Sequence, residues 1–200
     1  MLKRLTFLLL GVFATTVPAF AHFRPGDHGS IVSGLTHPFT GLDHIVVMIA
    51  VGLWAAAIGG RAKWLVPSAF LGCMITGYAV SIAGAELPFV EPTILASVIV
   101  LGILIAAPIR LPTVPGALLV GVFALFHGAA HGGEVGSADT LAFGIGFAVA
   151  TALLHAAGIG FGLMLGSGTR IGRTAGNALS RILGGLAAAV GIALALAAVS

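Results

Sequence analysis

The sequence contains few charged residues. Lysine, arginine, aspartate and glutamate make up 8% of its 200 residues, whereas 58% are hydrophobic. A typical soluble domain carries roughly 25% charged residues. This scarcity excludes an ordinary soluble domain and predicts an integral membrane protein whose main partner is the lipid bilayer.

Cysteine is also scarce, and one nucleotide-binding motif is absent. The single cysteine, Cys73, excludes an intrachain disulfide, and its apolar surroundings favour a small core residue over a metal ligand. The P-loop motif, GxxxxGK followed by Ser or Thr, does not occur, so the chain is not expected to hydrolyse ATP. The net charge of +3 comes from basic residues in predicted loops, which indicates topology and no nucleic-acid partner.

Residues 1–21 have the pattern of a secretory signal peptide. A basic start, a short apolar core and a small-x-small site ending at Ala21 follow one another. The apolar core is too short for a comfortable membrane span. We therefore predict cleavage that leaves His22 as the mature N-terminus, and an uncleaved first helix is the alternative.

Residues 22–200 predict a single transmembrane domain. Six apolar runs approach the roughly 20 residues that cross about 30 Å of hydrocarbon. Their approximate bounds are 41–58, 65–83, 93–107, 114–130, 140–165 and 182–199. The predicted fold is an all-α integral membrane protein, a six-helix transmembrane bundle after a cleaved N-terminal signal peptide.

The distribution of charge predicts the orientation of this bundle. With the mature N-terminus outside, the loops 59–64, 108–113 and 166–181 face the cytoplasm. Their basic residues are Arg61, Lys63, Arg110, Arg170, Arg173 and Arg181. The external segments hold one basic residue, Arg24, and the acidic residues Asp27, Glu86, Glu91, Glu134 and Asp139. This asymmetry fits the positive-inside rule and predicts a multi-pass protein of the cell inner membrane with both termini periplasmic or extracellular.

Small residues recur every four positions on the last two predicted spans. The two ridges are Gly158, Gly162 and Gly166, and Ala187, Gly191 and Ala195. Such ridges let helices approach closely. They predict close packing within the bundle or between the subunits of a homo-oligomer.

The first polar cluster lies at the start of the first span, in the stretch THPFTGLDHIVVM. His37 and His44 are seven residues apart and share one helical stripe if the helix extends back to His37, and Met48 continues this stripe. An ionisable residue inside a bilayer costs roughly 2.5–3.5 kcal/mol, which marks His37, Asp43 and His44 as candidate metal ligands. Two alternatives stay open: Asp43 forms a capping box with Thr40, and Met48 is a core residue.

The second polar cluster ends the fourth span. His127 and His131 are i, i+4 neighbours on one helical face, and Glu134 follows on nearly the same stripe. Imidazole and carboxylate together suit Ni, Co, Zn or Cu(II). The alternative is that His131 and Glu134 are loop residues that face water.

Four further residues are weaker candidates for metal binding. His155 lies near the middle of the fifth span, where it either hydrogen-bonds between helices or continues a metal path inward. His22, Asp27 and His28 lie in a predicted external arm over residues 22–35, where they either capture metal or are simply solvated.

These motifs resemble those of a known family. His37-Pro38-x-x-Gly41-x-Asp43-His44 and Phe126-His127-Gly128-x-Ala130-His131-Gly132-x-Glu134 are similar to the two signatures of the HupE/UreJ nickel and cobalt permeases. The resemblance extends over the whole chain. It implies that His37, Asp43 and His44 are ligands essential for transport and that His127, His131 and Glu134 face them.

The favoured hypothesis is a secondary transporter that imports Ni²⁺ or Co²⁺ through a His/Asp/Glu pathway. No permanently bound cofactor is expected; the metal is cargo, and Zn²⁺ or Cu²⁺ also suits the donors. The alternatives are an intramembrane Zn-dependent hydrolase, in which three ligands leave an open position for water, and a membrane metal-binding or sensing protein.

Overall fold

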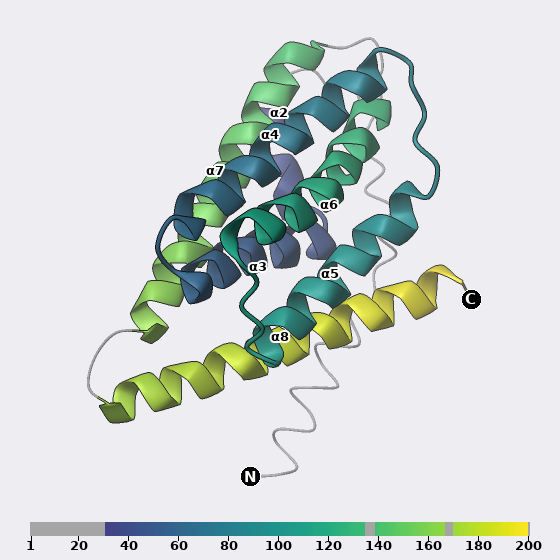
Figure 1. Cartoon of the computed structure of the whole chain (residues 1–200). Coiled ribbons are helices and arrows are strands. Elements are labelled where there is room, and N and C mark those ends of the chain that lie inside the picture. The colour runs from purple at the N-terminus through teal and green to yellow at the C-terminus, as the bar shows by residue number, and fades with distance from the viewer. Residues whose placement is uncertain (1–30, 135–138, 167–169, 200) are drawn as a thin grey trace.

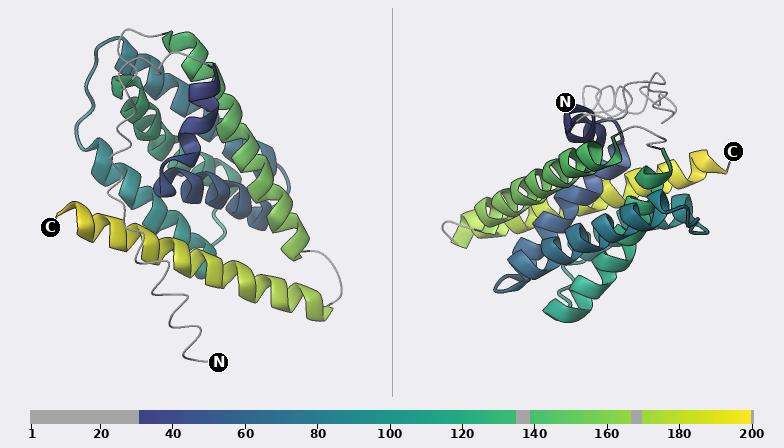
Figure 2. Two further views of the ribbon diagram at one scale, coloured as in Figure 1. Left: turned by 180° about the vertical axis from the view of Figure 1, so that it is seen from behind. Right: turned by 90° about the horizontal axis from the view of Figure 1, so that it is seen from above.

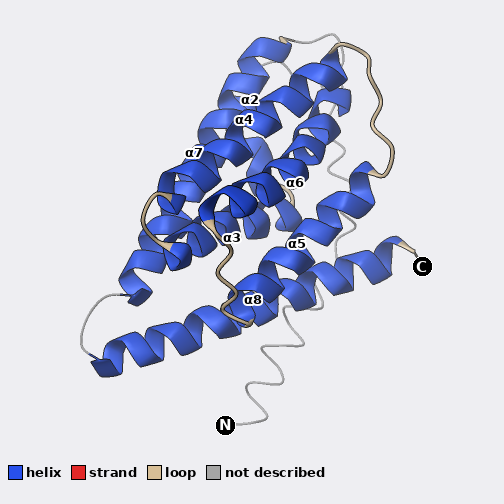
Figure 3. Cartoon of the chain, in the orientation of Figure 1, coloured by secondary structure: helices blue, strands red, loops and turns tan. Residues whose placement is uncertain are grey.

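The computed structural model describes residues 31–134, 139–166 and 170–199, and all regular structure in these ranges is helical (Figures 1 and 3). The elements in chain order are α2 (Ile31–Thr36), the 3₁₀ helix η1 (His37–Phe39), α3 (Leu42–Ile58), α4 (Ala62–Ile82), α5 (Val90–Ala106), α6 (Thr113–Glu134), α7 (Thr140–Gly166) and α8 (Arg170–Ala198).

Several of these helices have the length and composition of membrane spans. The described chain has four such helices: α4, α6, α7 and most of α8. The pair of α2–η1 with α3 passes the same test together but is bent by 84°, which makes five spans if the pair counts as one. α5 is apolar but has 17 residues, a length of about 26 Å. The all-α membrane bundle is confirmed, whereas the count of six spans stays a prediction and the signal peptide lies outside the described residues.

Three segments are helical beyond the predicted spans. α6 continues through His131 to Glu134, beyond the predicted end near residue 130. α8 begins at Arg170, so the predicted cytoplasmic loop 166–181 is largely helix. The last residues of the predicted arm form α2. Hydropathy locates the apolar part of a helix and not its ends, because polar residues such as Arg and Ser continue a helix into water when no Pro interrupts it.

α3 is the central helix of the bundle. Every residue from Ala50 to Ala55 is buried, and α3 packs on α4, α5 and α7. A helix that is buried on all sides belongs to the interior of a bundle. Figure 2 shows α8 along one edge of the bundle, where it crosses its main partner, α5.

Glycines set the closest contacts between helices. Gly52 of α3 and Gly158 of α7 lie so close that a Cβ at either one would collide with the backbone of the partner helix. Gly162 also faces α3, but Gly166 faces open space, so the predicted ridge on α7 is right at two of its three positions. Small residues at these points allow backbones to approach.

The predicted ridge on α8 is confirmed at Gly191 only. The residues that contact α5 are Gly184, Ala188 and Gly191, and Ala187 is only half-buried. Hydropathy and spacing could not distinguish the two registers, because alanine and glycine occupy both faces of this helix. These two glycines of α8 thus pack against another helix of the same chain.

Candidate metal site

The first polar cluster lies at a break between two helices. η1 contains His37, α3 contains His44, and the segments meet at an angle of 84° around Gly41. The predicted single stripe through His37, His44 and Met48 is therefore wrong, because no continuous helix connects the first two. Met48 instead lies fully buried in the core, in agreement with the core alternative.

The predicted capping box is also absent. α3 begins after Gly41, and no side chain caps its N-terminus. The hydroxyl of Thr40 donates to the carbonyl of His37 (2.7 Å), and Asp43 Oδ1 instead lies 3.0 Å from His44 Nδ1. A Cβ on Gly41 would lie 2.7 Å from that Asp43 oxygen and 2.8 Å from the His44 nitrogen. Glycine at this position therefore leaves room for the Asp43–His44 pair.

His131 of α6 joins the two sides of the break. Its Nδ1 lies 2.8 Å from His37 Nε2, and its Nε2 lies 2.6 Å from His44 Nε2. We call the series His37–His131–His44–Asp43 the histidine chain. His131 and His44 are buried, with 3% and 9% of their surface exposed, and His37 is half-buried.

One set of neutral tautomers satisfies every bond of the histidine chain. The Asp43 carboxylate accepts from Nδ1–H of His44, so His44 Nε2 carries a lone pair and accepts from Nε2–H of His131. His131 Nδ1 then accepts from Nε2–H of His37. The histidine chain is therefore a row of imidazole nitrogens that could act as metal ligands. Each ring is held by a hydrogen bond to its neighbour.

His127 lies beside this row and is held by a serine of α5. The Ser97 hydroxyl donates to the carbonyl of Ile94 (2.6 Å), so its oxygen accepts from His127 Nε2–H (3.0 Å). The His127 ring packs edge-on against His44, with centroids 5.2 Å apart. Within the described residues, His127 Nδ1 has no hydrogen-bond partner, although the residue is completely buried. This nitrogen presents a free lone pair.

Aromatic rings surround the histidines. Phe147 packs on His131 with ring centroids 4.5 Å apart, and Phe143 packs on His37 at 5.3 Å. Phe70 of α4 contacts His127 at 5.7 Å. These rings exclude water from the donors, and a low local dielectric strengthens any interaction of the donors with a cation.

The glycines of the second motif position its histidines. A Cβ on Gly128 would collide with the carbonyl of Met74, and a Cβ on Gly132 would lie 2.7 Å from the carbonyl of Tyr78. Both contacts are to α4. Because the face of α6 that carries these glycines packs against α4, His127 and His131 point toward α3 and α5.

The structure brings together the four members of the histidine chain, which are four of the six main candidate ligands. A fifth candidate, His127, lies beside them. The sixth, Glu134, is the last residue of α6, and its side chain lies outside the described part. His22, Asp27 and His28 also lie outside the described residues. His155 is buried further along α7, with 2% exposed. Sequence reasoning missed Ser97, whose signal was a lone polar residue within the apolar run of α5.

The described donors do not form a closed cage. In residues 31–134, 139–166 and 170–199, no three side chains of His, Cys, Asp or Glu converge so that they could hold a metal ion. The imidazole nitrogens bond to one another instead. Such a row can offer a cation successive partial sites, but it is not preorganised to retain one.

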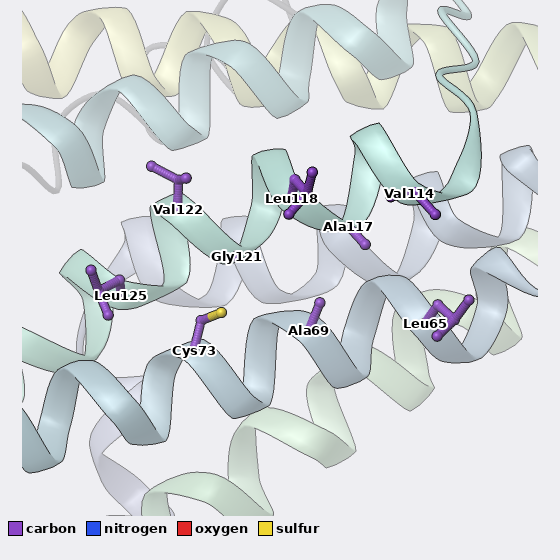
Figure 4. Close-up of a pocket in the computed structure, with 9 residues that line it drawn as sticks. All are labelled: Leu65, Ala69, Cys73, Val114, Ala117, Leu118, Gly121, Val122 and Leu125. Carbon is purple, nitrogen blue, oxygen red and sulfur yellow. The ribbon is translucent and has the colours of Figure 1, made fainter.

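The predicted core residue Cys73 lies in a separate groove. The groove has a volume of about 370 Å³ between α4 and α6, and its lining is apolar (Figure 4). Leu65, Ala69 and Cys73 line it from α4, and Leu118 and Leu125 from α6. No second metal donor accompanies the thiol there.

Comparison with known proteins identifies the family. The family model described as HupE / UreJ protein matches residues 9–194. The chain belongs to the HupE/UreJ family. Protein HupE of Rhizobium leguminosarum bv. viciae is 43% identical over 183 residues, which cover 90% of this chain and 93% of that protein. No solved structure matches the chain.

Family membership determines the general activity. HupE/UreJ proteins are nickel and cobalt transporters and not enzymes. This HupE/UreJ protein is therefore a multi-pass membrane permease for metal ions. The hydrolase alternative is wrong.

Proposed function

We propose that this permease imports Ni²⁺ or Co²⁺ across the inner membrane toward the cytoplasm, and that the histidine chain is the first part of its pathway. The observation that carries the proposal is the continuous set of contacts from His37 through His131 and His44 to Asp43. These contacts join three elements, η1, α6 and α3, around the two buried rings of His44 and His131.

The ion reaches the histidine chain from the outer side of the membrane. In the proposed orientation both termini are periplasmic, and signal cleavage leaves the amine and ring of His22 free to capture metal, together with Asp27 and His28. Glu134, at the end of α6, adds a carboxylate on the same side. The excess of basic residues in the other set of loops supports this orientation.

Transfer along the pathway proceeds by exchange of partners. A cation that enters replaces the hydrogen bonds between imidazoles with bonds to their nitrogens, and the free lone pair of His127 Nδ1 offers the next donor. Conduction requires sites that are weak or incomplete enough to release the ion. A row of donors without a closed cage meets that requirement.

The donors and the driving force fit a divalent transition metal. Imidazole with carboxylate suits Ni²⁺ and Co²⁺, and Zn²⁺ or Cu²⁺ would compete for the same atoms. An inside-negative potential of 100 mV favours entry of one charge by about 2.3 kcal/mol, so a doubly charged ion gains about 4.6 kcal/mol. A proton gradient is the second candidate driving force.

Uptake of labelled Ni²⁺ and Co²⁺ by cells that express the chain tests the proposal. We expect His44→Ala and Asp43→Asn each to lower initial uptake by at least about tenfold, because each change removes a donor or its orienting partner. Ile45→Ala is the matched control, since it truncates a half-buried neighbour that carries no donor atom.

Equal membrane levels of all variants make the comparison valid. If His44→Ala and Asp43→Asn both accumulate metal like the unaltered chain, the histidine chain is not the pathway. If the unaltered chain accumulates neither metal above cells without it, the proposed cargo is wrong.

A further inference from the structure

A second group of donor atoms lies between α4 and α7, beyond the histidine chain. Phe70 and Met74 are one turn apart on α4, and Thr151 and His155 are one turn apart on α7. The two pairs pack across the helix interface. Phe70 contacts the His155 ring with centroids 4.9 Å apart, and the Thr151 hydroxyl donates to the Met74 sulfur over 3.6 Å.

His155 carries an unpaired nitrogen in this interface. Its Nε2 has no hydrogen-bond partner within the described residues, and the side chain is 2% exposed. A buried polar atom without a partner destabilises the folded chain, because it has given up its bonds to water. In the middle of a membrane helix such a residue marks a functional site by default. Packing against Phe70 does not satisfy this nitrogen.

Met74 adds a soft donor to the same interface. It is 1% exposed, and its neighbour Thr151 is completely buried. A thioether sulfur is polarisable and binds softer transition metals in preference to Mg²⁺, Ca²⁺ or Mn²⁺. Nitrogen, sulfur and hydroxyl oxygen therefore occur together on two adjoining helix faces.

The position of these donors is intermediate along the bundle. Phe70 contacts both His127 of the outer group and His155 of this one. On the other side, the stripe of α7 that begins at His155 continues to Gly162 and Gly166. Both glycines line a cavity of about 250 Å³ that also contains Arg110, Asn177 and Ser180.

A close helix contact separates this cavity from His155. Between them, Gly158 packs directly against Gly52 of α3. His155 therefore lies after the histidine chain and before a polar cavity on the predicted cytoplasmic side. An ion that moves between the two must pass this level.

We propose that His155 Nε2 and the Met74 sulfur, assisted by the Thr151 hydroxyl, form an inner transit site for the transported divalent cation. The inference rests on the proposed function, because it takes the ion from the histidine chain. A set of one imidazole nitrogen, one weakly donating thioether and one hydroxyl binds a borderline ion such as Ni²⁺ or Co²⁺ loosely enough to release it. The sulfur also makes this site the one that rejects Mn²⁺ and Mg²⁺.

Two substitutions test the inner site by transport. Met74→Leu removes the sulfur at nearly constant volume, and such exchanges usually preserve the fold. We expect Met74→Leu to lower the maximum rate of Ni²⁺ uptake about fivefold and to reduce the preference for Ni²⁺ over Mn²⁺. His155→Gln should lower the maximum rate about tenfold. Neither should raise the half-saturating concentration, because the outer donors remain, whereas we expect His44→Ala to raise it.

The matched control is Met164→Leu, which makes the same change on α7 at a side chain that is 73% exposed. Loss of rate and preference in Met74→Leu but not in Met164→Leu supports the inner site. Wild-type rates and preference in both Met74→Leu and His155→Gln overturn it.

X-ray absorption of Co²⁺ bound to the purified chain tests the same site without transport. A sulfur neighbour that is present in the unaltered chain, persists in His44→Ala and Met164→Leu, and is lost in Met74→Leu supports the proposal. Absence of sulfur around Co²⁺ in the unaltered chain overturns it. Failure of the proposed function appears separately, as absence of uptake by the unaltered chain.

Discussion

The two ends of the α4–α6 pair differ in how closely the helices approach. At one end Gly77, Gly128 and Gly132 bring the two backbones into contact, and this end carries His127 and His131. At the other end an apolar groove of about 370 Å³ runs between the two helices, with Ala69 and Cys73 of α4 and Ala117 of α6 in its lining (Figure 4). The donor atoms occupy the end without the groove. Cavity size alone therefore does not locate metal chemistry in this bundle.

The largest expected effect comes from separating the closely packed end. Gly128→Ala places a Cβ against the carbonyl of Met74, so one helix must move, and overpacking of this kind costs about 1–3 kcal/mol. We expect a lower thermal unfolding midpoint in detergent and at least a tenfold loss of Ni²⁺ uptake. Gly72→Ala is the control, because a Cβ there meets open space. Equal midpoints for the two variants would show that close approach of α4 and α6 is unimportant.

An intermediate effect is expected from Ser97→Ala. This change leaves the helix contacts intact but removes the oxygen that accepts from His127 Nε2–H. Loss of a residue that orients a metal-binding histidine typically costs 10–100-fold in affinity or activity. We expect about a tenfold fall in uptake, and Ser97→Thr, which restores a hydroxyl, should recover part of it. Unchanged uptake in Ser97→Ala would remove His127 from the pathway.

The smallest effect is expected at the groove. Cys73→Ala removes the only thiol from an apolar lining, and no other donor accompanies it. Uptake of Ni²⁺ should stay within about twofold of the unaltered chain. A tenfold loss of uptake would show that the groove end of α6 also takes part in metal transport.

Sequence reasoning succeeded where the signal was local. Apolar runs located α3 to α7, and the spacing of His127 and His131 placed both on one helical face. The HPxxGxDH motif identified His37, Asp43 and His44 as a group, and the structure brings these three residues together.

The incorrect predictions concern how helices are joined and how residues distant in sequence come together. Nothing in the hydropathy of residues 36–44 shows the 84° bend, so His37 and His44 were expected on one stripe. They come together through His131, which is more than 80 residues distant in sequence from either of them. The role of Ser97 likewise depends on how α5 packs against α6, which composition does not determine.

The break before α3 has an electrostatic consequence. A helix directs its unpaired N–H groups, equivalent to about half a positive charge, toward the point at which it begins. This field would repel an arriving cation. Asp43 in the first turn of α3 supplies a full negative charge at the same place and reverses the sign of the local potential. Without that carboxylate, the interruption of the helix would suit an anion; with it, the same backbone geometry accepts a metal ion.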